Sequence, residues 1–191
     1  YVIPSDPDVS NDIASDGLFT EATGLGAYIR YSSGQTFGGW TVDSGNVDLQ
    51  GTNFGDSPLG GHSVDLNGST TGVISQALTT EAGKQYQVVF AFSGGFDFGE
   101  ITKNLRVSVD GQLNDYMMTE PLNWSESNPL WEHRSFTFTA DDASAILRFA
   151  SLESGADGAV IADVQVIEIP TVISMILNND PTLSYDAGTG K

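Results

Sequence analysis

The sequence predicts an all-β protein, an antiparallel β-sandwich of the jelly-roll type. Short stretches that alternate apolar and polar residues recur along the chain, and Gly, Asn and Asp separate them, as in strands joined by tight turns. Asp110-Gly111 lies between two such stretches, which is a strong hairpin signal. Helical periodicity is nearly absent, so the strands are expected to pack on one another as sheets.

The alternation places strands in close order from residue 40 onward. In one example, Phe136 and Phe138 alternate with Ser and Thr, as expected of a half-buried strand. Strands are expected near residues 40–43, 46–49, 62–67, 72–79, 85–93, 104–110, 113–118, 133–139, 145–151 and 160–168. Upstream, Asp16–Glu21 is expected to form a first short strand, and residues 22–38, rich in Gly, Ser and Thr, a long loop. Loops of this length are usually functional or mobile.

Composition divides the chain into three parts. Residues 1–15 are polar, hold two prolines, and are expected to form an extended lead-in. Residues 16–169 are the predicted β-jelly-roll domain. Beyond it, residues 170–191 begin with a proline and continue with apolar and then turn-rich sequence, which predicts a linker or the start of a neighbouring module. Because the chain does not begin with Met, we expect a piece of a longer protein.

The charge is strongly acidic. Seven basic residues stand against 25 acidic ones, for a net charge of −18. This balance excludes nucleic acid as a partner, because phosphate binding depends on clusters of Lys and Arg, and it disfavours anionic membrane surfaces. The surplus suits divalent cations, which take carboxylate and carbonyl oxygens as ligands. It equally suits solubility in a salty medium, where self-repulsion is screened, and the two interpretations are compatible.

The chain contains no cysteine, which excludes disulfides, thiolate metal sites and a cysteine nucleophile. Small secreted eukaryotic domains often rely on disulfides, so their absence favours a bacterial cell-surface or secreted protein. No apolar run approaches the roughly 20 residues that span a bilayer, and membrane insertion is not expected. The first residues lack the basic start and apolar segment of a signal peptide.

An enzymatic role is not expected. A glycosidase needs two carboxylates that face each other across a cleft, and among 25 acidic residues such pairs carry no signal. The two histidines, His62 and His133, have neither metal-ligand spacing nor a Gly-x-Ser-x-Gly partner. Both are interpreted as surface or core histidines, and no phosphate-binding loop is present.

Several motifs, taken in order, resemble the choice-of-anchor C family of bacterial surface proteins, which is related to plant cell-wall proteins of the same pattern. The motifs are Gly39-Trp40, Gly45–Asp48, Ser63–Gly68, Ile74–Gln76, Trp131, Ser135–Ala140 and Ile161–Val166. The resemblance covers roughly residues 16–168, as judged by motif order. It implies a galactose-binding-like jelly roll, a fold shared with many carbohydrate-binding modules, and those modules often carry a structural calcium ion.

The resemblance also implies where calcium (Ca²⁺) is bound. Its ligands come from an opening Asn-Gly-x-Phe-Glu strand and from the Asp of a closing Asp-x-Val strand, which Asp163 matches. Here the opening reads Asp16-Gly-Leu-Phe19-Thr20, so Thr20 stands where Glu is usual and Glu21 follows one place later. Either Glu21 substitutes by a shift in register, or Thr20 contributes only a carbonyl or hydroxyl oxygen.

Residue chemistry supports part of this ligand set. Asp163 lies inside an apolar strand, where an unpaired carboxylate is costly; metal ligation explains it, and so does an outward-facing position. Asp16, Glu21 and Asp43 are the next candidates, with solvated loop positions as the alternative. Asp48 and Asp65 lie in the family motifs, where hydrogen bonds in turns explain them equally well.

Sugar binding is the second expectation. Sugars are held by aromatic faces and polar groups, usually in loops on a rigid scaffold. Two loops qualify, one after residue 92 and one between residues 116 and 131. The predicted ligand-binding residues are Phe96, Asp97, Phe98, Tyr116, Asn123, Trp124 and Asn128. Trp40 and Trp131 are assigned to the core, and the long loop with Tyr28 and Tyr31 is a rival site.

These observations together predict a calcium-stabilised, non-catalytic carbohydrate-binding or adhesion module of a larger bacterial extracellular protein, such as an adhesin. Its expected partners are glycans or cell-wall polysaccharide and neighbouring domains of the same polypeptide. The alternative is a structural spacer that presents a neighbouring ligand-binding module.

Overall fold

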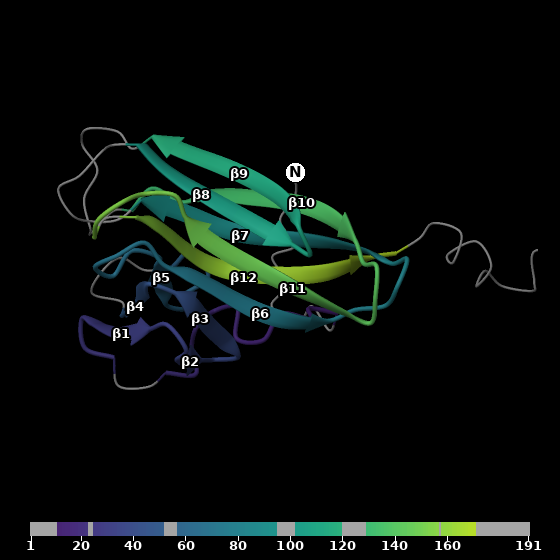
Figure 1. Cartoon of the computed structure of the whole chain (residues 1–191), viewed down its shortest axis with the longest axis horizontal. Coiled ribbons are helices and arrows are strands. Elements are labelled where there is room, and N and C mark those ends of the chain that lie inside the picture. The colour runs from purple at the N-terminus through teal and green to yellow at the C-terminus, as the bar shows by residue number, and fades with distance from the viewer. Residues whose placement is uncertain are drawn as a thin grey trace, which may run out of the picture.

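The computed structural model describes residues 11–22, 25–51, 57–94, 102–119, 129–156 and 158–170. Over these residues the chain forms two six-stranded antiparallel sheets, packed face to face as a sandwich (Figure 1). The predicted fold class is confirmed. No helix in these ranges is long and apolar enough to cross a membrane.

The first sheet has the order β1-β4-β5-β12-β7-β10 and the second β2-β3-β6-β11-β8-β9. The strands of the first sheet are β1 (Tyr28–Ser32), β4 (Asn46–Gln50), β5 (Ser63–Asp65), β7 (Gln85–Gly94), β10 (Glu132–Thr139) and β12 (Ala159–Ile169). Those of the second are β2 (Thr36–Phe37), β3 (Trp40–Ser44), β6 (Val73–Thr79), β8 (Thr102–Val109), β9 (Gln112–Thr119) and β11 (Ser144–Ser151). Every strand predicted from residue 40 onward is present near its expected bounds.

The core lies between the sheets, where each strand contributes every second side chain. Its centre is aromatic: the Phe149 ring lies 5.9 Å from Trp40 and 5.2 Å from Phe90, measured between ring centroids. Trp40 is fully buried, which confirms its assignment to the core, and Trp131 is partly buried.

Upstream of residue 40 the prediction was wrong in two places. Asp16–Glu21 is a turn rather than a strand, because Asp16 and Phe19 adopt positive φ angles of 42° and 55°. The supposed loop over residues 22–38 contains two edge strands: β1 pairs with β4 and β2 pairs with β3. Both strands lie at a sheet edge and are defined by backbone pairing with one neighbour, which the apolar–polar pattern of the sequence does not reveal.

The N-terminal segment (residues 11–22) is bonded to both sheets. The Ile13 N–H donates to the Val166 carbonyl in β12 at 2.9 Å. The Gln76 side chain in β6 accepts from the Ser15 N–H at 2.7 Å and donates to the Ser15 carbonyl at 2.8 Å. Residues 11–15 therefore belong to the folded unit, whereas the sequence analysis assigned them to the lead-in and began the domain at Asp16. The rest of that lead-in, residues 1–10, and residues 171–191 lie outside the described ranges.

Asp12 gives this segment a predicted pH dependence. One carboxylate oxygen of Asp12 accepts from the N–H groups of Ala14 and Val166, each at 2.9 Å. Burial raises the pKa of Asp12 above its ordinary value of 3.8, and these two hydrogen bonds oppose the rise. A raised pKa in the folded state contributes stability below pH 3.8 that is lost as the pH rises through the folded pKa.

We therefore expect Asp12→Asn, which keeps an oxygen acceptor without the charge, to be more stable than the wild type at pH 7. That gain should shrink toward zero at pH 3. Urea unfolding at both pH values measures it. The exposed Asp141→Asn variant has the same change in net charge and is the control. A gain at pH 7 no larger than that of Asp141→Asn would contradict the prediction.

Candidate functional site

Asp163 lies where three segments meet. It occupies the bulge that interrupts pairing between β12 and β7, at φ 53°, and its side chain is only 3% exposed. One carboxylate oxygen accepts from the Ser57 hydroxyl at 2.9 Å, and the other accepts from the Leu59 N–H at 3.1 Å. The buried carboxylate thus fixes the turn over residues 57–61 against β12.

The same turn is also bonded to the N-terminal segment. The Ser57 hydroxyl oxygen accepts from the Gly61 N–H at 2.8 Å, which closes the turn. The His62 N–H then donates to the Leu18 carbonyl at 2.9 Å. Next to the bulge, the Val164 N–H donates to the Gly17 carbonyl at 2.9 Å. β12, the turn and the N-terminal segment therefore form one hydrogen-bonded unit.

Burial is also the main influence on the ionisation of Asp163. It raises the pKa of this carboxyl, whereas the bonds from Ser57 and Leu59 and the charge of His133 lower it. His133 is exposed on β10, which is the surface position among its two interpretations, surface or core. His62 is half-buried, and its Nδ1 has no hydrogen-bond partner among the described residues.

Two of the other predicted calcium ligands, Asp16 and Asp43, have polar partners of their own. The Asp16 carboxylate accepts from the N–H groups of Thr20 and Glu21, at 2.6 and 3.1 Å, and from the Thr20 hydroxyl. Asp43 pairs with Arg148 at 3.0 Å and accepts from the Ser75 hydroxyl at 2.7 Å. No group of three or more Asp, Glu or His side chains able to hold a metal occurs within the described ranges.

Calcium takes about six to eight oxygen ligands, which include backbone carbonyls and waters as well as carboxylates, so the calcium site stays a prediction. If calcium binds the folded state, the thermal midpoint should be higher in excess calcium than in excess chelator. The stabilisation should grow with the logarithm of the calcium concentration once that concentration exceeds the dissociation constant. Differential scanning calorimetry measures the difference directly, and equal midpoints would contradict the prediction.

Asp48 and Asp65 have structural partners. Asp48 forms a two-point ion pair with Arg30, at 2.7 and 2.8 Å. Asp65 accepts from the Asn67 N–H at 2.8 Å, the turn hydrogen bond that was one of its two interpretations. Arg30 also donates to the Gly68 carbonyl at 2.5 Å, so the orientation of its guanidinium is fixed by Asp48 and Gly68 together.

Ile29 and Tyr31 of β1 pair with Leu49 and Val47 of β4, which are buried in the core. Tyr28 and Arg30 alternate with them and therefore lie on the face of β1 that points away from the core. Tyr28 is 48% exposed, and the Arg30 guanidinium carbon lies over its ring, 5.6 Å from the centre, in a cation–π contact. The guanidinium therefore covers one face of the ring, and the exposed part of the pair can contact a polar ligand. Sequence reasoning named Tyr28 as a rival site but missed Arg30.

Most predicted sugar-binding residues cannot be placed: Phe96, Asp97, Phe98, Asn123, Trp124 and Asn128 lie outside the described ranges. Tyr116 is described, and it belongs to the scaffold instead of a loop. Its ring packs edge-on against Phe90, with centroids 5.3 Å apart, and its hydroxyl donates to the Ser135 carbonyl at 3.4 Å. Tyr31 likewise packs on Phe37, at 4.7 Å.

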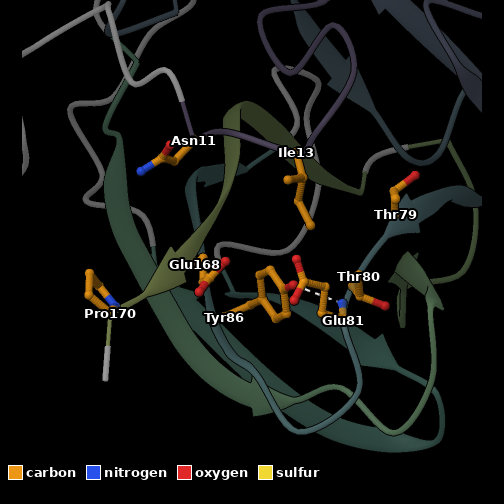
Figure 2. A pocket seen from close by; sticks show the side chains of 8 residues that line it. All are labelled: Asn11, Ile13, Thr79, Thr80, Glu81, Tyr86, Glu168 and Pro170. Atoms are coloured by element: carbon orange, nitrogen blue, oxygen red, sulfur yellow. Dashed lines mark hydrogen bonds between the residues drawn. The ribbon is translucent and has the colours of Figure 1, made fainter. Parts of the chain in front are cut away.

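A pocket of about 370 Å³ lies between the N-terminal segment, the end of β12 and the connection from β6 to β7. Its lining combines carboxylates, hydroxyls, an amide and apolar side chains: Asn11, Ile13, Thr79, Thr80, Glu81, Tyr86, Glu168 and Pro170. Glu81 and Glu168 lie on the two sides of the Tyr86 ring (Figure 2). Sequence reasoning did not find this pocket, because its walls come from three distant parts of the chain.

Solved structures align with this chain at low identity and TM-scores of 0.50 or less. A family 35 carbohydrate-binding module from Clostridium thermocellum aligns with 74% of this chain and 98% of its own, at 14% identity and a TM-score of 0.48. TmCBM61 in complex with beta-1,4-galactotriose aligns with 68% and 87%, at 17% identity and 0.47. The arabinose-bound MgGH51 α-L-arabinofuranosidase aligns with 85% and 27%, at 10% identity and 0.50. Likeness at this level concerns the fold alone.

Two sequence relationships are more specific. Halomucin of Haloquadratum walsbyi (strain DSM 16790 / HBSQ001) is 31% identical over 185 residues, which are 95% of this chain and 2% of halomucin. The chain thus spans a very small part of that relative. The sequence model of DUF642, described as a protein of unknown function, matches residues 18–167. This range agrees with the extent of the predicted resemblance, whereas the choice-of-anchor C assignment stays a prediction.

Proposed function

This chain belongs to the DUF642 family, whose function is unknown, and we propose that its domain is a non-catalytic carbohydrate-binding module. The observation that carries the proposal is the exposed Tyr28 ring beside Arg30 on the outer face of the first sheet. The proposed ligands are glycans, cell-wall polysaccharides among them. An extracellular setting and a role in adhesion, as part of a larger protein, belong to the same proposal.

Sugar rings present apolar C–H faces and a rim of hydroxyls, and the Tyr28–Arg30 pair matches both. The aromatic ring offers a flat apolar surface, and the guanidinium offers N–H donors to hydroxyl oxygens. Asp48 and the Gly68 carbonyl hold that guanidinium in place before any ligand arrives. Pre-orientation lowers the entropy lost on binding, so even a small contact area can give useful affinity.

The contacts of several described acidic groups support the non-catalytic part of the proposal. Asp48 pairs with Arg30, Asp43 with Arg148, and Asp115 with Arg106 at 2.7 Å. The hydrogen bond from Arg106 lowers the pKa of Asp115, which makes this carboxyl a poor proton donor at neutral pH.

The test is a broad glycan array, followed by calorimetric titration of the best ligand into the wild type and Tyr28→Ala. We expect Tyr28→Ala to bind at least about tenfold more weakly, because it loses the stacking surface, at an unchanged melting midpoint. Leu113→Ala removes a comparably exposed apolar side chain (57%) from β9 and should bind like the wild type. An array without ligands, or equal affinity in Tyr28→Ala, would refute the proposal.

A further inference from the structure

The pocket in Figure 2 is a second candidate binding site, and it shares no lining residue with the Tyr28 face. We propose that it binds a cationic saccharide unit, an amino sugar with a protonated amine. This goes beyond the function proposed above, because it adds a separate site and specifies the charge of its ligand.

The walls of the pocket are fixed by backbone pairing, so the site exists before a ligand binds. Asp12 pairs with Ile167 in an isolated β-bridge, which holds the N-terminal wall against the end of β12. On the opposite wall, Thr80 donates through its N–H to the Ala143 carbonyl at 3.0 Å and through its hydroxyl to the Asp142 carbonyl at 2.8 Å. A preformed pocket of about 370 Å³ lies at the small end of the range for ligand sites and accommodates one sugar unit.

Tyr86 forms the base of the pocket, with a rigidly packed ring and a polar hydroxyl. The Tyr86 ring is 3% exposed and stacks on Phe138, with centroids 5.4 Å apart. Its hydroxyl oxygen accepts from the Glu81 N–H at 3.0 Å, so the hydroxyl proton remains to be donated to a ligand oxygen. Ile13 and Pro170 add apolar surface for the C–H groups of a sugar.

The charge of the lining selects a cation. Glu81 and Glu168 supply two carboxylates, and no Lys or Arg is among the lining residues. Lys84 lies outside the lining, 2.6 Å from one Glu168 oxygen and 3.9 Å from Glu81. Since one lysine is shared by two carboxylates, the site keeps a net negative charge, within a chain of net charge −18. A ligand ammonium is attracted, whereas a carboxylate ligand is repelled.

The test uses the full chain and three ligands at pH 6 in low salt: a glucosamine trimer, its N-acetylated counterpart and cadaverine. Calorimetry gives affinities, and amide chemical shifts locate the site. We expect the glucosamine trimer to bind with shifts at Thr80 and Tyr86, and both the neutral trimer and cadaverine to bind at least about tenfold more weakly. Equal binding of the neutral trimer overturns the role of charge, and equal binding of cadaverine overturns the saccharide assignment.

Variants separate this site from the Tyr28 face. Glu168→Gln should weaken the glucosamine trimer about tenfold, and Lys84→Met should strengthen it, because it releases Glu168 from its ion pair. Asp141→Asn corrects for the change in net charge. Tyr28→Ala should leave this binding intact. Chemical shifts confined to the Tyr28 face would refute the pocket proposal and leave the first proposed function standing. A glycan array without ligands, together with binding of the glucosamine trimer in the pocket, would refute the first proposal and support the second.

Discussion

Replacing Phe19 with alanine is expected to lower the free energy of unfolding by about 3–5 kcal/mol. The Phe19 side chain is completely buried, and its ring lies 5.7 Å from Trp40 and 6.3 Å from Phe37, between centroids. It is the main apolar anchor of the N-terminal segment. The substitution removes that anchor and leaves a cavity beside the aromatic core, and neither effect can relax easily in close-packed surroundings.

Equilibrium unfolding in urea measures this loss. Leu18→Ala is the matched control, because Leu18 is the adjacent residue and is 37% exposed; it should cost less than about 1 kcal/mol. Similar losses for the two variants would mean that the N-terminal segment is not packed as described.

Gly17→Ala is expected to destabilise the protein by about 3 kcal/mol or more. A β-carbon built at Gly17 lies 1.8 Å from the Val164 carbonyl oxygen, which is backbone and cannot rotate away. Relief requires the segment to separate from β12, which breaks the bond from the Val164 N–H to the Gly17 carbonyl. The thermal midpoint should fall by about 6–12 °C or more.

Gly26→Ala is the control for that variant, because a β-carbon at Gly26 meets nothing within 4 Å. Hydrogen exchange at the Val164 amide keeps the test informative for a weakly folded protein. Exchange should accelerate in Gly17→Ala and stay slow in Gly26→Ala. Slow exchange in both, with equal midpoints, would contradict the close approach of Gly17 to β12.

The sequence predicted the sandwich where local pattern and tertiary burial agree. In β10, Phe138 is buried between two exposed threonines, as the alternation required. Asp110-Gly111 joins β8 to β9 with φ angles of 46° and 90°, the positive values that a two-residue hairpin turn needs. The pattern failed for β1, whose residues are almost all exposed: Tyr31 alone of this edge strand packs on the core, so its sequence shows no alternation to detect.

The candidate site was less accessible to prediction because its bonds join distant residues. The apolar strand around Asp163 left both a buried and an outward-facing position open, and its partner Ser57 is 106 positions away. The pairing of Arg30 with Asp48 depends on the register between β1 and β4, which no local motif specifies. Tyr116 lies in the strand predicted over residues 113–118, and its ring packs on Phe90 because alternate side chains of β9 face the core, a contact that no local motif specifies.

Asn11 and Pro170 line one pocket, so the first and last described residues lie close together at one end of the sandwich. Domains whose chain ends lie close together tolerate circular permutation and insertion into a host protein. The described part of this fold can therefore be placed in a loop of another domain without forcing the two ends of that loop apart.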